Sequence, residues 1–303
     1  MSSNLSNLND KLSKIIYLQL ILTMVVWGGT FVAGKIVAQN LSPFVAAFSR
    51  FAIASLGLWL LNIVQKNRLE KLNYRQIWLL ALLGLSGVLA YNIFFFLGLK
   101  DIAASRAGLI IALNPVTIAL GSSLFWREKL SYLKILGIFI ALTGAILVIT
   151  KGDLQTAIAQ GIGRGELYIL GCVVSWVVYS LVGKLAMQQL SVVTTTSYAI
   201  WLGTLFLLPL AIWEQQNRLP NINWLTGLCL MYLGILGTVI AFNWYYLGIK
   251  ILGAAKAGIF INLVPVFAAV FGFIFLQESF TPILFVGGGC VLIGVSLVNQ
   301  PTD

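Results

Sequence analysis

The sequence has little charge and no histidine. Only 9% of its 303 residues are charged, whereas an ordinary soluble domain carries roughly 25% charged residues. Histidine is the usual proton shuttle and a common metal ligand near neutral pH, and this chain contains none. The composition therefore excludes an ordinary soluble globular domain and a histidine-based metal centre.

Motifs for catalysis and cofactor binding are also missing. The three cysteines, Cys172, Cys229 and Cys290, lie inside apolar runs without metal or redox spacing, so we interpret them as small core residues. No phosphate-binding G-x-x-x-x-G-K-[ST] loop, zinc-binding H-E-x-x-H helix or G-x-S-x-G turn occurs. We therefore expect no cofactor, no bound metal and no enzymatic activity, and an ATP-driven pump within this chain is disfavoured.

Hydrophobic residues make up 59% of the chain, and the mean hydropathy is +0.96. About 20 helical residues cross a hydrocarbon core roughly 30 Å thick, and the alternating pattern of barrel strands is absent. The apolar runs of about this length are 15–37, 43–64, 76–99, 103–125, 131–150, 165–187, 193–213, 223–249, 253–276 and 280–298. The sequence predicts an all-α integral membrane protein with ten transmembrane helices.

Lysine and arginine predict the orientation of these helices. The net charge of +10 would suggest nucleic acid binding in a soluble protein, but here the basic residues flank the spans and act as topology signals. Placing both termini in the cytoplasm puts about twice as many basic residues on the inner side as on the outer side. We expect a multi-pass protein of the cell (inner or plasma) membrane, with a lipid bilayer and no nucleic acid as partner.

The two halves of the sequence match at an offset of about 150 residues. The matched pairs are Gly84 with Gly234, Gly87 with Gly237, Pro115 with Pro265, Glu128 with Glu278, Gly137 with Gly287 and, at offset 149, Trp27 with Trp176. An odd number of spans per half places the second copy in the membrane upside down. The sequence therefore predicts two inverted five-helix repeats, residues 1–150 and 151–303, a plan common among transporters.

Several motifs give the chain a resemblance to a known family. They are the segment WGGTFVAGK at residues 27–35, Pro43 followed by Arg50, Asn114-Pro115, and Glu128 followed by Gly137. In this order, and with the proline and Glu–Gly features repeated in the second half, they resemble the EamA family of the drug/metabolite transporter superfamily. The second copy departs from the pattern at Ala199, which stands in the place of Arg50. The resemblance implies ten helices, cytoplasmic termini, and export or exchange of small metabolites such as amino acids.

Amides and aromatic rings inside the apolar runs are the candidate substrate-binding residues. The predicted set is Trp27, Tyr91, Asn92, Asn114, Trp176, Tyr179, Asn243, Trp244 and Asn262. Buried amides either serve helix packing or line a cavity, and aromatic rings either stack on a substrate or face lipid. As a set they favour a neutral, zwitterionic or amphipathic substrate over a phosphorylated one.

Prolines and charged residues are the candidate moving parts. Pro115 and Pro265 lie in mid-span, where they break the helical hydrogen bonds and can act as hinges or border a cavity. Glu128 and Glu278 are predicted gate latches on opposite membrane faces, with simple helix-dipole carboxylates as the alternative. Arg50 lies within a span and needs either an anionic substrate group or a structural partner. No carboxylate lies at the centre of a span, which argues against proton antiport through a central glutamate.

These features predict a secondary transporter or facilitator of small metabolites. We expect it to export amino acids or related compounds by alternating access through a central cavity between the repeats. Transport of sugars or nucleotide sugars is an alternative, and a lipid scramblase or membrane scaffold is an alternative of another class. A monomer is sufficient for this mechanism, and a homodimer remains open.

Overall fold

The computed structural model describes residues 2–66, 69–126, 131–153, 162–215, 222–252, 260–279 and 281–298, and within them every regular element is a helix. The elements are α1 (Ser2–Asn40), α2 (Pro43–Val64), α3 (Tyr74–Leu83), η1 (Gly84–Ala90), α4 (Tyr91–Asp101), α5 (Ala104–Ile111), α6 (Asn114–Trp126), α7 (Tyr132–Thr150), α9 (Arg164–Ala186), α10 (Val192–Gln215), α11 (Trp224–Met231), η2 (Tyr232–Ile240), α12 (Ala241–Leu252), η3 (Ile261–Leu263), α14 (Val264–Leu276) and α15 (Pro282–Val298). The predicted helical class is confirmed for these residues.

Eight helical segments are long and apolar enough to cross a membrane. They are Ile15–Asn40, Pro43–Val64, Tyr74–Asp101, Ala104–Phe125, Tyr132–Thr150, Arg164–Ala186, Val192–Gln215 and Trp224–Tyr245. Two shorter apolar helices, Ile261–Leu276 and Pro282–Val298, overlap the last two predicted runs. The start of the ninth predicted run, 253–259, lies outside the described residues, so the count of ten spans stays a prediction.

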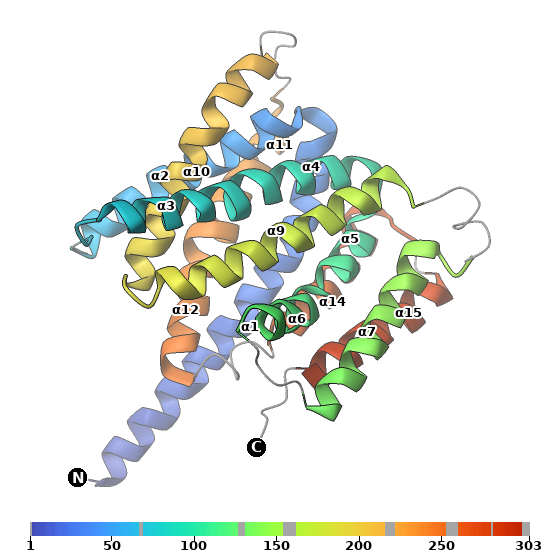
Figure 1. The fold of residues 1–303 in the computed structure, drawn as a ribbon, viewed down its shortest axis with the longest axis horizontal. Helices are drawn as coiled ribbons and strands as arrows, with labels where there is room; N and C mark the ends of the chain where they lie inside the picture. Colours follow the sequence, from blue (N-terminus) through green and yellow to red (C-terminus); the bar gives the residue numbers. More distant parts are fainter. Residues whose placement is uncertain are drawn as a thin grey trace.

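Most helix packing joins the first half of the sequence to the second (Figure 1). Helix α9 lies along α3, η1 and α4, and α1 lies along α11, η2 and α12. Helix α2 packs on α10, and α5 packs on α14. These contacts bring both halves of the chain around one centre.

Two glycines at matched positions lie at close contacts between the two halves. A Cβ on Gly84 would lie 2.8 Å from the backbone nitrogen of Gly203 on α10. A Cβ on Gly234 would lie 3.0 Å from the backbone oxygen of Arg50 on α2. At both positions an added methyl group would crowd the facing backbone, so glycine lets these helices approach closely.

Helices α2 and α10 cap one another at both ends. The carboxylate of Glu214, at the end of α10, accepts hydrogen bonds from the backbone nitrogens of Phe44 and Val45 at 2.8 and 3.2 Å. Glu70, beyond the end of α2, accepts one from the backbone nitrogen of Ser191 at 3.1 Å, just before α10 begins. Each carboxylate satisfies amide groups that a helix start leaves unpaired and offsets the positive end of the helix dipole.

Helices α7 and α15 form a separate pair at one edge of the molecule (Figure 1). Their contact is built from glycines on both sides, because a Cβ on Gly137 would meet the backbone oxygen of Gly294 at 2.6 Å. Gly144 faces the backbone of Gly287 in the same way. Small residues let two membrane helices approach closely, and large apolar side chains such as Phe139 and Phe285 face outward.

Candidate functional site

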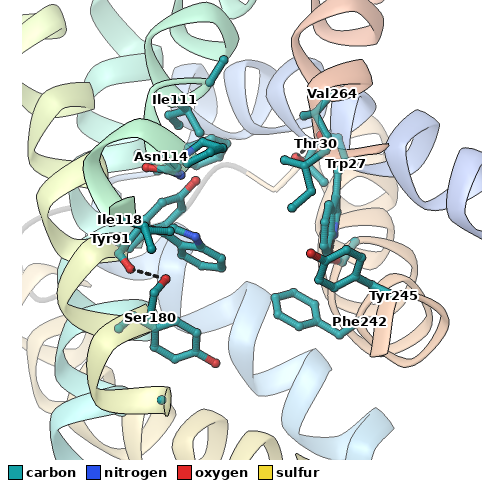
Figure 2. A pocket seen from close by; sticks show the side chains of 18 of the residues that line it. Trp27, Thr30, Tyr91, Ile111, Asn114, Ile118, Ser180, Phe242, Tyr245 and Val264 are labelled. Atoms are coloured by element: carbon teal, nitrogen blue, oxygen red, sulfur yellow. Dashed lines mark hydrogen bonds between the residues drawn. The ribbon is translucent and has the colours of Figure 1, made fainter. Parts of the chain in front are cut away.

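A cavity of about 360 Å³ lies where the two halves of the chain meet (Figure 2). Its walls come from α1, α2, α3, α4, α5, α6, α9, α10, η2, α12, η3 and α14. This volume is in the range of small-molecule sites, which are mostly apolar with a few placed polar groups. The cavity is the candidate functional site of the molecule.

Aromatic rings form two facing groups on the cavity walls. Trp27 lies against Tyr245 and Phe242, with ring centroids 5.2 and 5.5 Å apart. Trp176 lies against Tyr91 and Tyr179, with centroids 5.3 and 5.1 Å apart. In Figure 2, Trp27, Phe242 and Tyr245 occupy one side of the cavity and Tyr91 the other. A planar or apolar solute between the two groups would contact rings on both sides.

Five of the predicted binding residues line this cavity. They are Trp27, Tyr91, Asn114, Trp176 and Tyr179. The sequence reasoning omitted Phe242, Thr195 and Ser180, which also line it. A small hydroxyl or a phenylalanine within an apolar run carries no signal that distinguishes it from packing.

Four predicted binding residues do not line the cavity. Asn92 is buried beside it, Asn243 donates to the backbone oxygen of Val239 at 3.0 Å, and Asn262 donates to the hydroxyl of Ser296 at 3.3 Å. Asn92 and Asn243 donate to backbone oxygens one turn earlier in the chain, and Asn262 reaches Ser296 on α15. Trp244 also lies outside the lining, although its neighbour on α12, Tyr245, is part of it.

Arg50 brings the only charge to the cavity lining of the described residues. The residue is 8% exposed, and its Nη1 donates to Oδ1 of Asn92 at 3.0 Å. The guanidinium carbon lies 5.3 Å from the ring centre of Phe51 and 6.0 Å from that of Phe95. These contacts orient the cation, and none of them neutralises it.

A π-helical segment holds Asn92 in place. The side-chain nitrogen of Asn92 donates to the backbone oxygens of Gly87 and Val88 at 3.2 and 2.9 Å, both within η1. In the second half, η2 covers the matched positions, and the indole nitrogen of Trp27 donates to the backbone oxygen of Gly237 at 3.1 Å. π-Helical turns often mark functional sites, and here both position side chains at the cavity.

Pro115 and Pro265 line the cavity, and each follows an interruption of its helix. Helix α5 ends at Ile111 and α6 begins at Asn114, while the short 3₁₀ turn η3 precedes α14. Proline removes a backbone donor and clashes with the preceding turn, which explains both interruptions. The predicted mid-span breaks therefore lie beside the cavity.

Glu278 caps helix α5 at one end of the molecule. Its carboxylate accepts hydrogen bonds from the backbone nitrogens of Ala104 and Ser105 at 2.6 and 3.0 Å, and from the Ser105 hydroxyl at 2.6 Å. The contact joins the end of α14 to the start of α5. Glu128, its predicted counterpart, lies outside the described residues.

An ion pair that the sequence reasoning missed lies next to this cap. Arg106 on α5 and Glu166 in the first turn of α9 form a salt bridge of 2.7 Å. Arg106 also donates to the backbone oxygens of Val148 and Ile149 at the end of α7. In the sequence, Arg106 lies near the end of a span, where a basic residue is interpreted as a signal for membrane orientation. Its partner Glu166 is 60 positions away, so no local pattern predicts the ion pair.

Lys35 completes this group by donating to the backbone oxygen of Ile102 at 2.8 Å. We call Lys35, Arg106, Glu166 and Glu278 the polar cluster. The cavity extends away from it: Glu166 lies in the first turn of α9, whereas Ser180 and Gly183, near the other end of α9, line the cavity. The polar cluster therefore ties helices together at the end of the molecule opposite to the one the cavity approaches.

Comparison with known proteins gives a consistent set of relatives. The profile of the EamA-like transporter family matches residues 14–150 and 163–300. An uncharacterized transporter of Archaeoglobus fulgidus is 32% identical over 286 residues, covering 93% of this chain and 96% of that protein. A protein of Streptantibioticus cattleyicolor, named a probable terminal-alkyne amino-acid exporter, is 29% identical and covers 96% of this chain and 95% of its own length.

Two further comparisons extend this set. The S-adenosylmethionine/S-adenosylhomocysteine transporter of Chlamydia trachomatis is 27% identical, covering 90% of this chain and 85% of that protein. A protein crystal structure superposes with a TM-score of 0.63 at 19% sequence identity, covering 93% of this chain and 97% of the other. At this identity the superposition shows a shared fold.

Proposed function

This chain belongs to the EamA-like transporter family, and from that membership we propose that it exports amino acids or related small metabolites as a secondary transporter or facilitator. The observation that carries the proposal is the aromatic cavity between the two halves of the chain. The two relatives with named substrates support it, because terminal-alkyne amino acids and S-adenosylmethionine both contain an α-amino acid group. The chain is a multi-pass membrane protein of a family that moves small molecules.

The proposed architecture is ten spans in two inverted repeats, residues 1–150 and 151–303. Support comes from the reciprocal contacts of Gly84 with α10 and Gly234 with α2, and from the two segments that match the family. Both termini are placed in the cytoplasm of a cell (inner or plasma) membrane, as the distribution of basic residues favours. A monomer is sufficient because one chain supplies all the cavity walls.

The proposed mechanism is alternating access. With the termini inside, the polar cluster lies at the outer face and the cavity extends toward the cytoplasm. In this state Glu278 acts as the outer latch by holding α5, and Glu128 is proposed as its inner counterpart. Pro115 and Pro265 supply hinges, because the helix interruptions beside them weaken two spans at cavity level.

Transport by purified protein in proteoliposomes tests the proposal. Vesicles are loaded with unlabelled amino acids, and uptake of each labelled amino acid by exchange is measured against protein-free vesicles. We expect saturable uptake that unlabelled substrate suppresses. Non-saturable flux, or movement of labelled lipid without movement of solute, contradicts the proposal. Cysteines introduced at positions 35 and 66 test the orientation, since they are expected to react from opposite sides.

A further inference from the structure

Three buried polar atoms on residues that line the cavity have no hydrogen-bond partner. They are Nε of Arg50, Oδ1 of Asn114 and Oγ1 of Thr195. Two other such atoms in the described part of the chain, on Gln19 and Thr226, belong to residues outside the lining. Burying a polar group without a partner is unfavourable, and more so when the group is charged. The residues that line the cavity therefore carry polar groups that the described part of the chain leaves unsatisfied.

Arg50 is the least satisfied of the three. A guanidinium has five N–H donors, and the one hydrogen bond it makes to the described residues goes to Oδ1 of Asn92. No carboxylate of the described residues forms an ion pair with it. Asn92 is itself fixed by two backbone oxygens of η1, so this hydrogen bond holds the cation in one orientation and leaves its other donors without a partner among the described residues.

Arg106 shows what a structural arginine looks like in the same protein. It is as buried as Arg50, at 8% exposed, but it forms an ion pair with Glu166 and two hydrogen bonds to backbone oxygens. It does not line the cavity. A buried arginine in this fold can therefore have an anionic partner, as Arg106 does, and Arg50 differs from it among the described residues.

We propose that Arg50 binds the carboxylate of the transported compound. This deepens the proposed function and rests on it. The planar fork of a guanidinium matches a carboxylate in two parallel hydrogen bonds. Asn114, whose Oδ1 is an unpaired acceptor, receives an N–H group of the same compound. Figure 2 shows Asn114 on the wall opposite Trp27 and Tyr245.

The charge of the lining defines the substrate class further. A single cation balances one carboxylate, so a small monocarboxylate with an apolar or aromatic body fits, whether anionic or zwitterionic. A phosphate would leave negative charge unbalanced in an apolar cavity, and an amine without a carboxylate would face Arg50 without any anion in the described lining. Transport therefore discriminates by the carboxylate more than by the rest of the molecule.

Three compounds with the same ring test this proposal. L-phenylalanine, 3-phenylpropionate and L-phenylalaninamide compete for exchange in proteoliposomes of the full-length protein. The two acids should compete at concentrations about 10- to 100-fold lower than the amide, as expected for a charge-assisted pair of hydrogen bonds. Arg50→Gln should abolish this preference, and Arg50→Lys should retain part of it because the charge remains. Arg106→Gln is the matched control: it alters rates and leaves the preference as in the wild type.

Thermal unfolding in detergent separates a binding role from a folding role. Without ligand, Arg50→Gln should melt no lower than the wild type, because it removes an unneutralised buried charge, and phenylalanine should no longer raise its melting temperature. An Arg50→Gln protein that keeps the preference for acids, or a wild type that accepts the amide equally well, overturns the role of Arg50 and leaves the proposed function standing. If the protein exchanges neither these three compounds nor any proteinogenic amino acid, both the role of Arg50 and the proposed function are overturned.

Discussion

Arg106 and Glu166 join helix α5 to the first turn of α9 through a salt bridge of 2.7 Å. Both side chains are largely buried, with 10% and 8% of their surfaces exposed. Because α5 and α9 come from different halves of the chain, the pair connects the two halves at the end opposite to the cavity. In the proposed alternating-access cycle we expect this bond to break when the face that carries the polar cluster opens.

Glu166→Gln should lower the free energy of unfolding by about 1.5–3 kcal/mol, the range for a hydrogen bond to a charged group. Arg106 would keep its two backbone acceptors, Val148 and Ile149, but would lose its counter-ion. The double variant Arg106→Gln/Glu166→Gln should be less destabilised than the sum of the single variants. Thermal melts of the wild type, the two single variants and the double variant measure the interaction free energy between the two side chains. If the effects of the single variants simply add, the salt bridge does not contribute to stability.

Glu278→Gln should open the cavity toward the face that carries the polar cluster. The neutral amide cannot accept from Ala104 and Ser105 with the strength of a carboxylate, and it loses the favourable interaction with the start of α5. The measurement is the rate at which a membrane-impermeant thiol reagent, added to that face, labels a cysteine introduced at Thr30 in the cavity lining.

Glu214→Gln is the matched control for this experiment. Glu214 also caps a helix start, and among the described residues its hydrogen bonds come from Phe44 and Val45 of α2 instead of α5. The control should weaken the protein to a similar extent without raising the labelling rate. Equal labelling in both variants would mean that any loss of a cap loosens the fold, and Glu278 would then have no special role as a latch.

Gly84→Ala should destabilise the protein by about 1–3 kcal/mol, as expected for an overpacked contact. The new methyl group would collide with the backbone of Gly203 on α10, which cannot move as a flexible side chain can. Gly227→Ala, within α11, provides the control because a Cβ there meets nothing within 4 Å. Alanine is the better helix former, so this control should be neutral or stabilising by up to about 1 kcal/mol. If Gly227→Ala also destabilises the protein, replacement of glycine is harmful in general, and the loss at Gly84 cannot be assigned to its contact with α10.

The periodic features of the chain are the ones that sequence analysis predicts well. Apolar runs, prolines and glycines act locally, so the helices, the breaks before Pro115 and Pro265, and the matched positions 150 apart follow from the sequence alone. Pairing between distant residues does not follow. Arg106 with Glu166, and Glu70 with Ser191, depend on how the helices pack, and nothing in the local sequence specifies it.

The candidate site shows the same division. The concentration of aromatic rings in the third, sixth and eighth predicted spans predicts an aromatic cavity, and Tyr91 and Trp176 line it together with Trp27 of the first span. Asn92 and Asn262 have the same local signature as Asn114, yet only Asn114 belongs to the lining. Which face of a helix an amide occupies depends on the rotation of that helix against its neighbours, and a sequence of nearly uniform hydrophobicity does not fix that rotation.

Pro115→Ala and Pro265→Ala should reduce transport more than they reduce folding. Alanine restores a backbone donor at each position and favours a continuous helix across the interruption beside the cavity. The melting temperature should stay the same or rise, whereas the exchange rate should fall because a helix without proline bends less easily beside the cavity. Pro209→Ala is the control, since Pro209 lies inside α10 and outside the cavity lining. If all three variants exchange solute at the same rate, the interruptions shape the cavity wall without taking part in the motion, and the hinge must lie elsewhere.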